Sequence, residues 1–122
     1  MKIHPDKPHF QSINAYGPDW VQVGGEKITH SIILDSRGKR LDWPCSRFED
    51  ITTEVFEQLA QWQPELVIFG SGERLRFVHP SLTQALMQRQ IGLETMDTQA
   101  ACRTYNILAA EGRYVAVALL MR

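Results

Sequence analysis

Residues 66 to 72 read LVIFGSG and show most directly how this chain folds. The first four are continuously apolar and too few for a helix, which is typical of a β-strand that is covered on both faces. Gly70 and Gly72 then interrupt the strand. A strand of this kind needs a layer on each side, so these residues predict an α/β fold.

The chain after this strand predicts a helical connection to a parallel neighbour. A short extended piece, Leu75 to Val78, leads through Pro80 into a helix that Gly92 follows. One side of this helix carries Leu82, Ala85, Leu86 and Arg89. Leu93 to Met96 forms the next strand. Because helical crossovers join parallel strands, we expect the strands 66–69 and 93–96 to end at the same edge of the sheet.

Two further helices follow from apolar spacing and capping residues. Thr52 or Thr53 caps a helix that ends before Pro64, with Val55, Phe56, Leu59 and Trp62 or Gln63 on one face. Asp97 and Thr98 cap a helix over residues 99–111, which Gly112 stops. Residues 113–120 return as the final strand.

The N-terminal half reads as an antiparallel meander. Phe10 to Tyr16 and Trp20 to Val23 are the first two strands, and Gly24-Gly25 is a turn. Ile28 to Asp35 alternates with a period of two and predicts one continuous third strand. His30 falls on the apolar side of that alternation, so we expect a core histidine rather than a functional titratable group.

Size and charge set limits on the class of protein. A chain of 122 residues fits one domain, so we expect residues 1–122 to fold as a single unit. The formal net charge is −1, which offers no strong field for nucleic acid or an acidic membrane surface. A nucleic-acid partner is therefore the least favoured class.

Neither a signal peptide nor a membrane segment is expected. The first ten residues hold no apolar stretch, and the longest apolar run, Val115 to Met121, reads as a buried strand. Cys45 and Cys102 then read as free thiols of a reducing cytoplasm. His4, His9, His30 and His79 are scattered, so we expect neither a metal nor a cofactor.

The two adjoining strand ends suggest a ligand site. Gly70, Ser71 and Gly72 should lie beside Asp97 and Thr98, at the edge where open α/β sheets hold ligands. Flexible glycines and the N-terminus of a helix suit a small anion or a carbonyl. The alternative is an ordinary tight turn after a buried strand, which we favour, because neither loop matches a phosphate-binding motif.

The helix over residues 99–111 has one apolar and one polar side. Its polar side carries Gln99, Cys102, Arg103 and Asn106. Arg103 and Asn106 either recognise a carboxylate or a partner's backbone, or brace the helix against neighbouring loops. Cys102 could be a thiol activated by the helix dipole, but a small semi-buried residue is favoured because no histidine lies nearby in sequence. No catalytic residue is predicted, since Ser71 does not sit in a nucleophile elbow.

Two segments closely resemble one family. They are Gly70-Ser71-Gly72 and the stretch DTQAACRTYNIL of residues 97–108, followed by Glu111-Gly112-Arg113. The chain resembles the small α/β domain family of unknown function that includes mitochondrial respiratory complex I assembly factor 3 and many bacterial and archaeal proteins. The resemblance implies a three-layer fold with a central mixed β-sheet, flanking helices and an additional antiparallel β layer formed by the N-terminal half. Without a mitochondrial presequence, the chain looks like a prokaryotic member.

Three functions are open at this point. The resemblance and the lack of a complete catalytic constellation favour a noncatalytic interaction or assembly protein with an unidentified protein partner. The second hypothesis is an enzyme or sensor that binds an anionic metabolite between the Gly70 loop and Thr98. The third is nucleic-acid binding, which the charge opposes.

Overall fold

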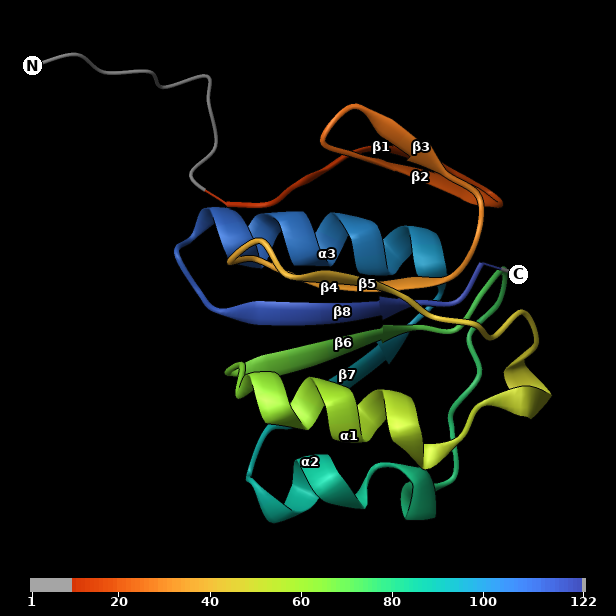
Figure 1. Cartoon of the computed structure of the whole chain (residues 1–122), viewed down its shortest axis with the longest axis vertical. Helices are drawn as coiled ribbons and strands as arrows, with labels where there is room; N and C mark the ends of the chain where they lie inside the picture. Colours follow the sequence, from red (N-terminus) through yellow and green to blue (C-terminus); the bar gives the residue numbers. More distant parts are fainter. Residues whose placement is uncertain (1–9, 122) are drawn as a thin grey trace, which may run out of the picture.

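The computed structural model describes residues 10–121, which form two β-sheets and three α-helices (Figure 1). The smaller sheet is antiparallel and consists of β1 (Ile13–Gly17), β2 (Trp20–Val23) and β3 (Glu26–Ile28). The larger has the strand order β5-β4-β8-β6-β7. Its strands are β4 (Ile32–Asp35), β5 (Arg40–Asp42), β6 (Leu66–Gly70), β7 (Gly92–Met96) and β8 (Val115–Leu119). The helices are α1 (Thr53–Trp62), α2 (Gln84–Gln88) and α3 (Thr98–Ala110), with short 3-10 turns η1 (Phe48–Asp50) and η2 (Pro80–Leu82).

The larger sheet is mixed, as expected. β6 runs parallel to both β7 and β8, whereas β4 runs antiparallel to β5 and β8. β8 therefore lies between a parallel and an antiparallel neighbour. The predicted parallel relation between the strands at 66–69 and 93–96 is confirmed.

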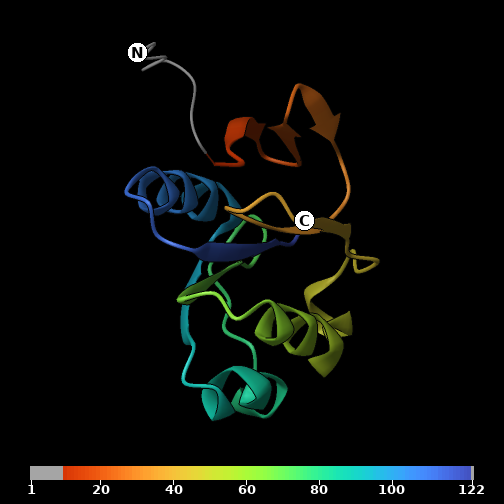
Figure 2. The same cartoon turned by 60° about the vertical axis from the view of Figure 1, so that its left-hand side comes forward.

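The central strands are buried on both faces because each face has its own core. Along β8 and the residue after it, Val115, Val117 and Leu119 join one core, while Ala116, Ala118 and Leu120 join the other. The first core is completed by α3 and the three-stranded sheet, and the second mainly by α1 and α2. Turning the molecule shows these layers above and below the central sheet (Figure 2). The three-layer architecture implied by the family resemblance is confirmed.

The expected third strand is wrong in one respect. Residues 28–35 do not form one strand, because β3 ends at Ile28 and β4 begins at Ile32 in the other sheet. The crossing is fixed at Ser31, whose hydroxyl accepts a hydrogen bond from the N–H of Met121 at 2.9 Å and whose carbonyl accepts one from Trp43 at 3.0 Å. All four residues of β4 are buried, so this strand does not alternate between buried and exposed residues.

The expectation of a core histidine at position 30 is also wrong. His30 lies in the crossing between the sheets, its side chain is 55% exposed, and its Nε2 is 2.8 Å from Oδ1 of Asp42. Asp42 belongs to β5, a strand that the sequence did not reveal. The buried carboxyl group of this region is Asp35, at the end of β4.

The second helix is shorter than its apolar side suggested. Pro80 begins the 3-10 turn η2, and α2 covers only Gln84–Gln88. The left-handed residue that follows α2 is Gln90, with φ of 58°, while Gly92 already belongs to β7. Within residues 10–121, no helix combines the length and the apolar character that a bilayer span requires.

Candidate functional site

The loop that follows β6 lies directly beside the start of α3. Gly70 is paired with Met96 in the parallel ladder, and the N–H of Ser71 donates to the carbonyl of Met96 at 2.9 Å. Asp97 and Thr98, which come next in the chain, therefore adjoin Gly70, Ser71 and Gly72. The juxtaposition expected from the sequence is present.

Thr98 occupies the space between the two loops and ties them together. Its hydroxyl accepts a hydrogen bond from the N–H of Gly72 at 2.8 Å and donates one to the carbonyl of Leu120 at 2.7 Å. Its N–H donates to the carbonyl of Gly72 at 2.9 Å. Thr98 and Gly72 are both buried, so these bonds are shielded from water.

Gly70 and Ser71 also serve the packing of this corner. A Cβ atom on Gly70 would stand 3.0 Å from the Cα of Thr98, so a larger residue would push the helix and the strand apart. The hydroxyl of Ser71 donates to the carbonyl of Arg74 at 2.7 Å and accepts from the N–H of Arg76 at 3.0 Å. It therefore shapes the loop that leaves the corner.

The positive end of α3 is partly satisfied within the chain. The carboxylate of Asp97 accepts from the N–H of Ala100 at 2.9 Å, and the carbonyl of Asp97 accepts from Ala101 at 2.9 Å. The bond to Ala101 is the first regular bond of the helix, so of the four N–H groups that begin it, those of Thr98 and Ala100 have partners outside the helical pattern. That an anion binds here stays a prediction, and such an anion would compete with bonds already made.

Arg103 and Asn106 lie against β1 rather than at this corner. The side-chain amide of Asn106 accepts from the N–H of Ile13 at 3.0 Å and donates to its carbonyl at 2.8 Å. Asn106 thus braces the helix against the small sheet, one of the two roles that the sequence left open. A hydrogen bond with Tyr16 raises the pKa of the exposed Arg103 guanidinium.

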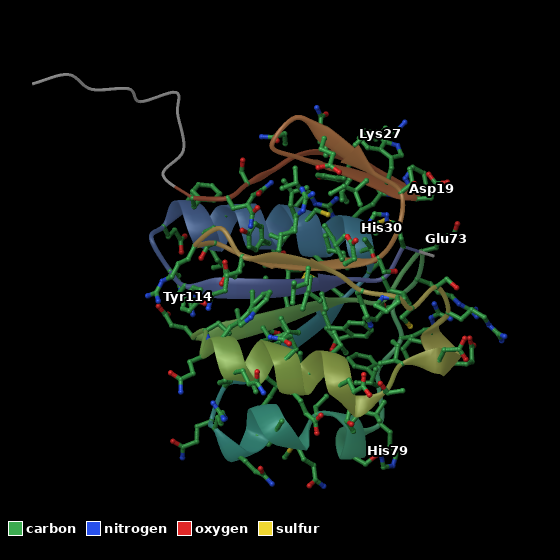
Figure 3. The ribbon with its side chains drawn as sticks, viewed as in Figure 1. Asp19, Lys27, His30, Glu73, His79 and Tyr114 are labelled. Carbon is green, nitrogen blue, oxygen red and sulfur yellow. The ribbon has the colours of Figure 1, made fainter. Side chains whose placement is uncertain are left out.

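The thiols and histidines do not converge on a reactive centre. Cys102 was wrongly assigned to the polar side of α3: it is fully buried, and burial raises the pKa of its thiol to about 12. His30 and His79 lie in different layers (Figure 3), and His4 and His9 lie outside the described residues. Residues 10–121 contain no group of three or more His, Cys, Asp or Glu side chains that could hold a metal ion.

The surface beside β7 carries a groove that the sequence does not reveal. Its volume is about 510 Å3, and its apolar lining includes Phe77, Val78, Leu86, Met87, Ile91 and Leu93. Phe77 is 70% exposed and Met87 is 64% exposed. One signal was available in the sequence, because neither residue has an expected core position. Phe77 lies in the short extended piece before Pro80, outside the expected strands and helices, and Met87 falls outside the apolar side of α2.

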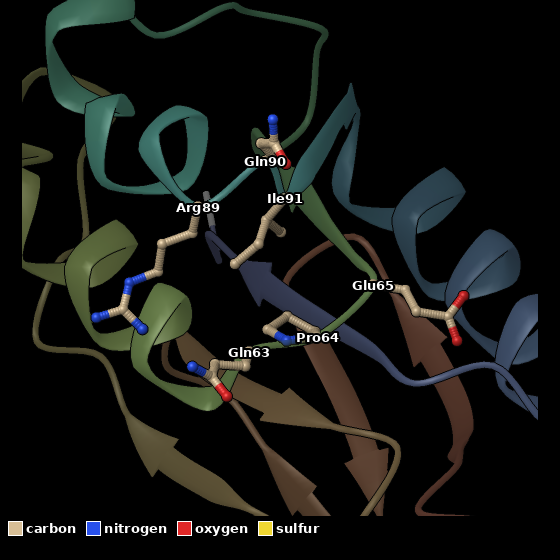
Figure 4. A pocket seen from close by; sticks show the side chains of 6 residues that line it. All are labelled: Gln63, Pro64, Glu65, Arg89, Gln90 and Ile91. Carbon is tan, nitrogen blue, oxygen red and sulfur yellow. The ribbon is translucent and has the colours of Figure 1, made fainter.

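A second hollow of about 580 Å3 adjoins this groove at Ile91 (Figure 4). Its charged side chains, Arg89 and Glu65, point in opposite directions. Arg89 donates to the carbonyl of Ala60 at 3.3 Å, and Glu65 accepts from Arg113 at 3.2 Å. Bonds with Tyr114 and Arg113 lower the pKa of Glu65. The two charges therefore serve the surrounding structure and do not face a common ligand position.

Comparison with known proteins gives consistent matches over the chain. Residues 13–120 match the family described as "Protein of unknown function (DUF498/DUF598)". A relative from Mus musculus, "NADH dehydrogenase [ubiquinone] 1 alpha subcomplex assembly factor 3", is 38% identical over 120 residues. The alignment covers 97% of this chain and 64% of that protein, so the chain spans just under two thirds of the relative's length.

Solved structures share the fold. The crystal structure of a Bordetella parapertussis protein matches with a TM-score of 0.86 and 39% identity, covering 93% of this chain and 97% of that one. The solution structure of a Bordetella pertussis protein, described as an Mth938-like domain, matches with a TM-score of 0.85 and 34% identity. That match covers 99% of this chain and 92% of the other.

Proposed function

This chain belongs to the DUF498/DUF598 family, and from that membership we propose that it is a noncatalytic protein that binds other proteins during the assembly of a complex. The observation that carries the proposal is the 38% identity to an assembly factor along nearly the whole chain. By the same relation, we propose a subunit of the host's NADH dehydrogenase as the partner.

The chemistry of the described residues supports a binding role over a catalytic one. Nucleophilic catalysis needs an exposed nucleophile with a base beside it. The Ser71 hydroxyl is buried between main-chain partners, and Cys102 is buried with a raised pKa. The exposed Phe77 and Met87, in contrast, present apolar surface of the kind that proteins use to bind one another.

Gentle purification of the tagged chain from its native host tests the proposal. We expect a stable complex with a defined protein partner, and less fully assembled NADH dehydrogenase on native gels when the gene is deleted. A chain that stays alone in extracts, in a host whose NADH dehydrogenase assembles normally without it, would contradict the proposal.

The second candidate is a binding protein for a small anionic metabolite. It is favoured by the meeting of Gly70, Ser71 and Gly72 with Asp97 and Thr98 at the start of a helix. A metabolite that binds only the folded state raises the melting temperature, so a thermal-shift screen identifies it. Arg103 interacts electrostatically with Asp97 at this corner, so the shift should be lost in Arg103→Ala and kept in the distant control Arg47→Ala. An unaltered shift in Arg103→Ala would remove Arg103 from the site.

We further propose that the protein acts in the cytoplasm and binds no nucleic acid, in line with a net charge of −1. Fluorescence anisotropy with labelled DNA and RNA at low salt checks the second point, and salt-sensitive binding would contradict it.

A further inference from the structure

The outer edge of β7 is open to a further strand. β7 stands at the end of the strand order of the central sheet, with β6 as its only neighbour among the strands of residues 10–121. The groove lined by Phe77, Met87 and Leu93 runs beside this edge. An edge strand next to an apolar groove is the arrangement that accepts extended peptides by strand addition.

The hydrogen bonds of the ladder show which main-chain groups face outward. The carbonyl of Met96 accepts from Ser71 of β6, so the main-chain groups of Met96 point toward β6. In a parallel ladder this direction alternates from residue to residue, so the N–H and C=O groups of Leu93 and Thr95 point away from β6. No main-chain group within residues 10–121 bonds to them. Four groups, spaced by two residues, are therefore ready to pair with an added strand.

The side chains of β7 distinguish its two faces. Leu93 packs against the core formed with α1 and α2, and Leu93 and Thr95 both line the groove. Glu94 also borders the groove. Because Met96 packs against the opposite core and side chains alternate along a strand, the side chain of the exposed Glu94 is directed to the face of α3. An added strand would turn alternate side chains into the apolar groove and the others toward Glu94.

We infer that the β7 edge and its groove receive an extended segment of a partner protein as a sixth strand of the central sheet. The segment places apolar side chains between Phe77 and Met87, and a lysine or arginine opposite Glu94. The inference rests on the proposed function, and it adds the surface and the chemistry of the partner.

The charge of Glu94 selects a partner over a second copy of this chain. Self-pairing of two antiparallel β7 strands with Leu93 opposite Thr95 would bring the Glu94 side chains of both copies together. Like charges directly opposite each other destabilise a strand pair, whereas opposite charges stabilise it. The edge therefore discourages that symmetric dimer and favours a basic segment.

A displayed library of linear peptides, selected on the full chain, provides the probe. We expect the enriched peptides to alternate apolar residues with lysine or arginine. Thr95→Pro removes an outward N–H while the bonds between β7 and β6 remain. It should therefore weaken the binding of a synthetic copy of the best peptide by at least about tenfold. Thr95→Val keeps that N–H and should bind within about twofold of the unmodified chain. Enriched peptides without alternation, or equal binding by Thr95→Pro and Thr95→Val, would overturn the inference.

A charge exchange keeps the test decisive if Thr95→Pro does not fold. Glu94→Lys should reject the basic peptide and bind an analogue in which glutamate replaces each basic residue. Phe77→Ser should weaken binding, whereas Ile107→Ser, at a residue 59% exposed on α3, should not. If Glu94→Lys and Phe77→Ser both bind the peptide as tightly as the unmodified chain does, the inference is overturned.

Two other occupants of the edge are separate outcomes. A dimer in sedimentation that Thr95→Pro dissociates would identify a second copy, and it would overturn the inference. Peptide binding seen only after removal of residues 1–9 would identify those residues as the occupant of the edge, and it would also overturn the inference.

The tagged variants separate this inference from the proposed function. If the chain purified from its host retains its protein partner equally in Thr95→Pro and Thr95→Val, the binding function stands and the β7 edge is excluded. If no partner is recovered with any variant, the proposed function itself fails.

Discussion

The hydroxyl of Tyr114 donates a 2.7 Å hydrogen bond to the buried carboxylate of Asp35. Asp35 ends β4 and Tyr114 precedes β8, so the bond fastens these paired strands at one end of the sheet. The carboxylate also accepts from the N–H groups of Arg37 at 3.0 Å and Lys39 at 2.8 Å. The guanidinium of Arg37 lies 3.8 Å from the centroid of the Tyr114 ring. These donors compensate the loss of water around a buried charge.

This arrangement predicts a loss of stability in alkali. Burial and the bond to Asp35 raise the pKa of Tyr114 to about 12. Because the folded protein holds this proton more tightly than the unfolded chain, the contribution is complete below about pH 10 and declines as the pH rises toward 12. Tyr114→Phe should lower the free energy of unfolding at pH 8 by about 2 kcal/mol and make the alkaline decline shallower.

Urea denaturation at a series of pH values measures both effects. Tyr16→Phe, at a half-buried tyrosine of the small sheet, is the control for the loss of a phenol hydroxyl that does not bond Asp35. A decline between pH 10 and 12 that is identical in Tyr114→Phe and the unmodified chain would exclude Tyr114 as a source.

Removing the Thr98 hydroxyl should destabilise the corner of β6 and α3. Thr98→Val keeps the shape of the side chain but leaves the buried N–H of Gly72 and carbonyl of Leu120 without this partner, at a cost of about 2–4 kcal/mol. Thr98→Ser keeps the hydroxyl and should cost less. Chemical denaturation compares the two, and equal losses would show that the methyl group matters more than the hydrogen bonds.

Asn106 should control how firmly the small sheet is held. Asn106→Ala removes both bonds to Ile13 and should lower the free energy of unfolding by about 1–2 kcal/mol. Amide hydrogen exchange should quicken in β1 and β2 before it changes in β8, because only the small sheet is released. Ile107→Ala, at the exposed neighbouring position, should stay within about 0.5 kcal/mol of the unmodified chain. Uniform exchange across both sheets would contradict this role.

The two thiols should differ in accessibility. Cys45 is partly exposed and Cys102 is buried. In Cys102→Ser, the remaining Cys45 should react with a disulfide reagent in the folded protein. In Cys45→Ser, the remaining Cys102 should react only after guanidinium is added, because burial both shields it and raises its pKa. Rapid labelling of Cys102 in the folded protein would contradict the structure.

The parallel pair of β6 and β7 could be predicted because its signals are local. The apolar run of β6, the turn at Gly70 and the cap at Asp97 depend on adjacent residues only, and the structure agrees with each. The crossing at Ser31 could not be predicted, because it depends on a bond from Met121, ninety positions away. Burial of Cys102 was missed for a similar reason, since the small sheet covers that side of α3.

In the candidate site, too, some features follow from the order of elements along the chain and others depend on distant residues. Topology alone brought Gly70, Ser71 and Gly72 beside Asp97 and Thr98. The Thr98 hydroxyl forms hydrogen bonds with Gly72 and Leu120. These bonds depend on the register of β8, which no local pattern reveals. The groove at β7 went unnoticed because the exposure of Phe77 and Met87 is a property of the assembled surface.

The position of β8 has a consequence for biosynthesis. β8 is made after every other strand of residues 10–121, yet it lies between β4 and β6, where Val117 pairs with both Leu34 and Ile68. A nascent chain on the ribosome therefore carries two separate halves of the central sheet until residues 115–119 emerge. During that interval the inner flanks of β4 and β6 have no partner, and unpaired edges of this kind are where a chain pairs with other chains.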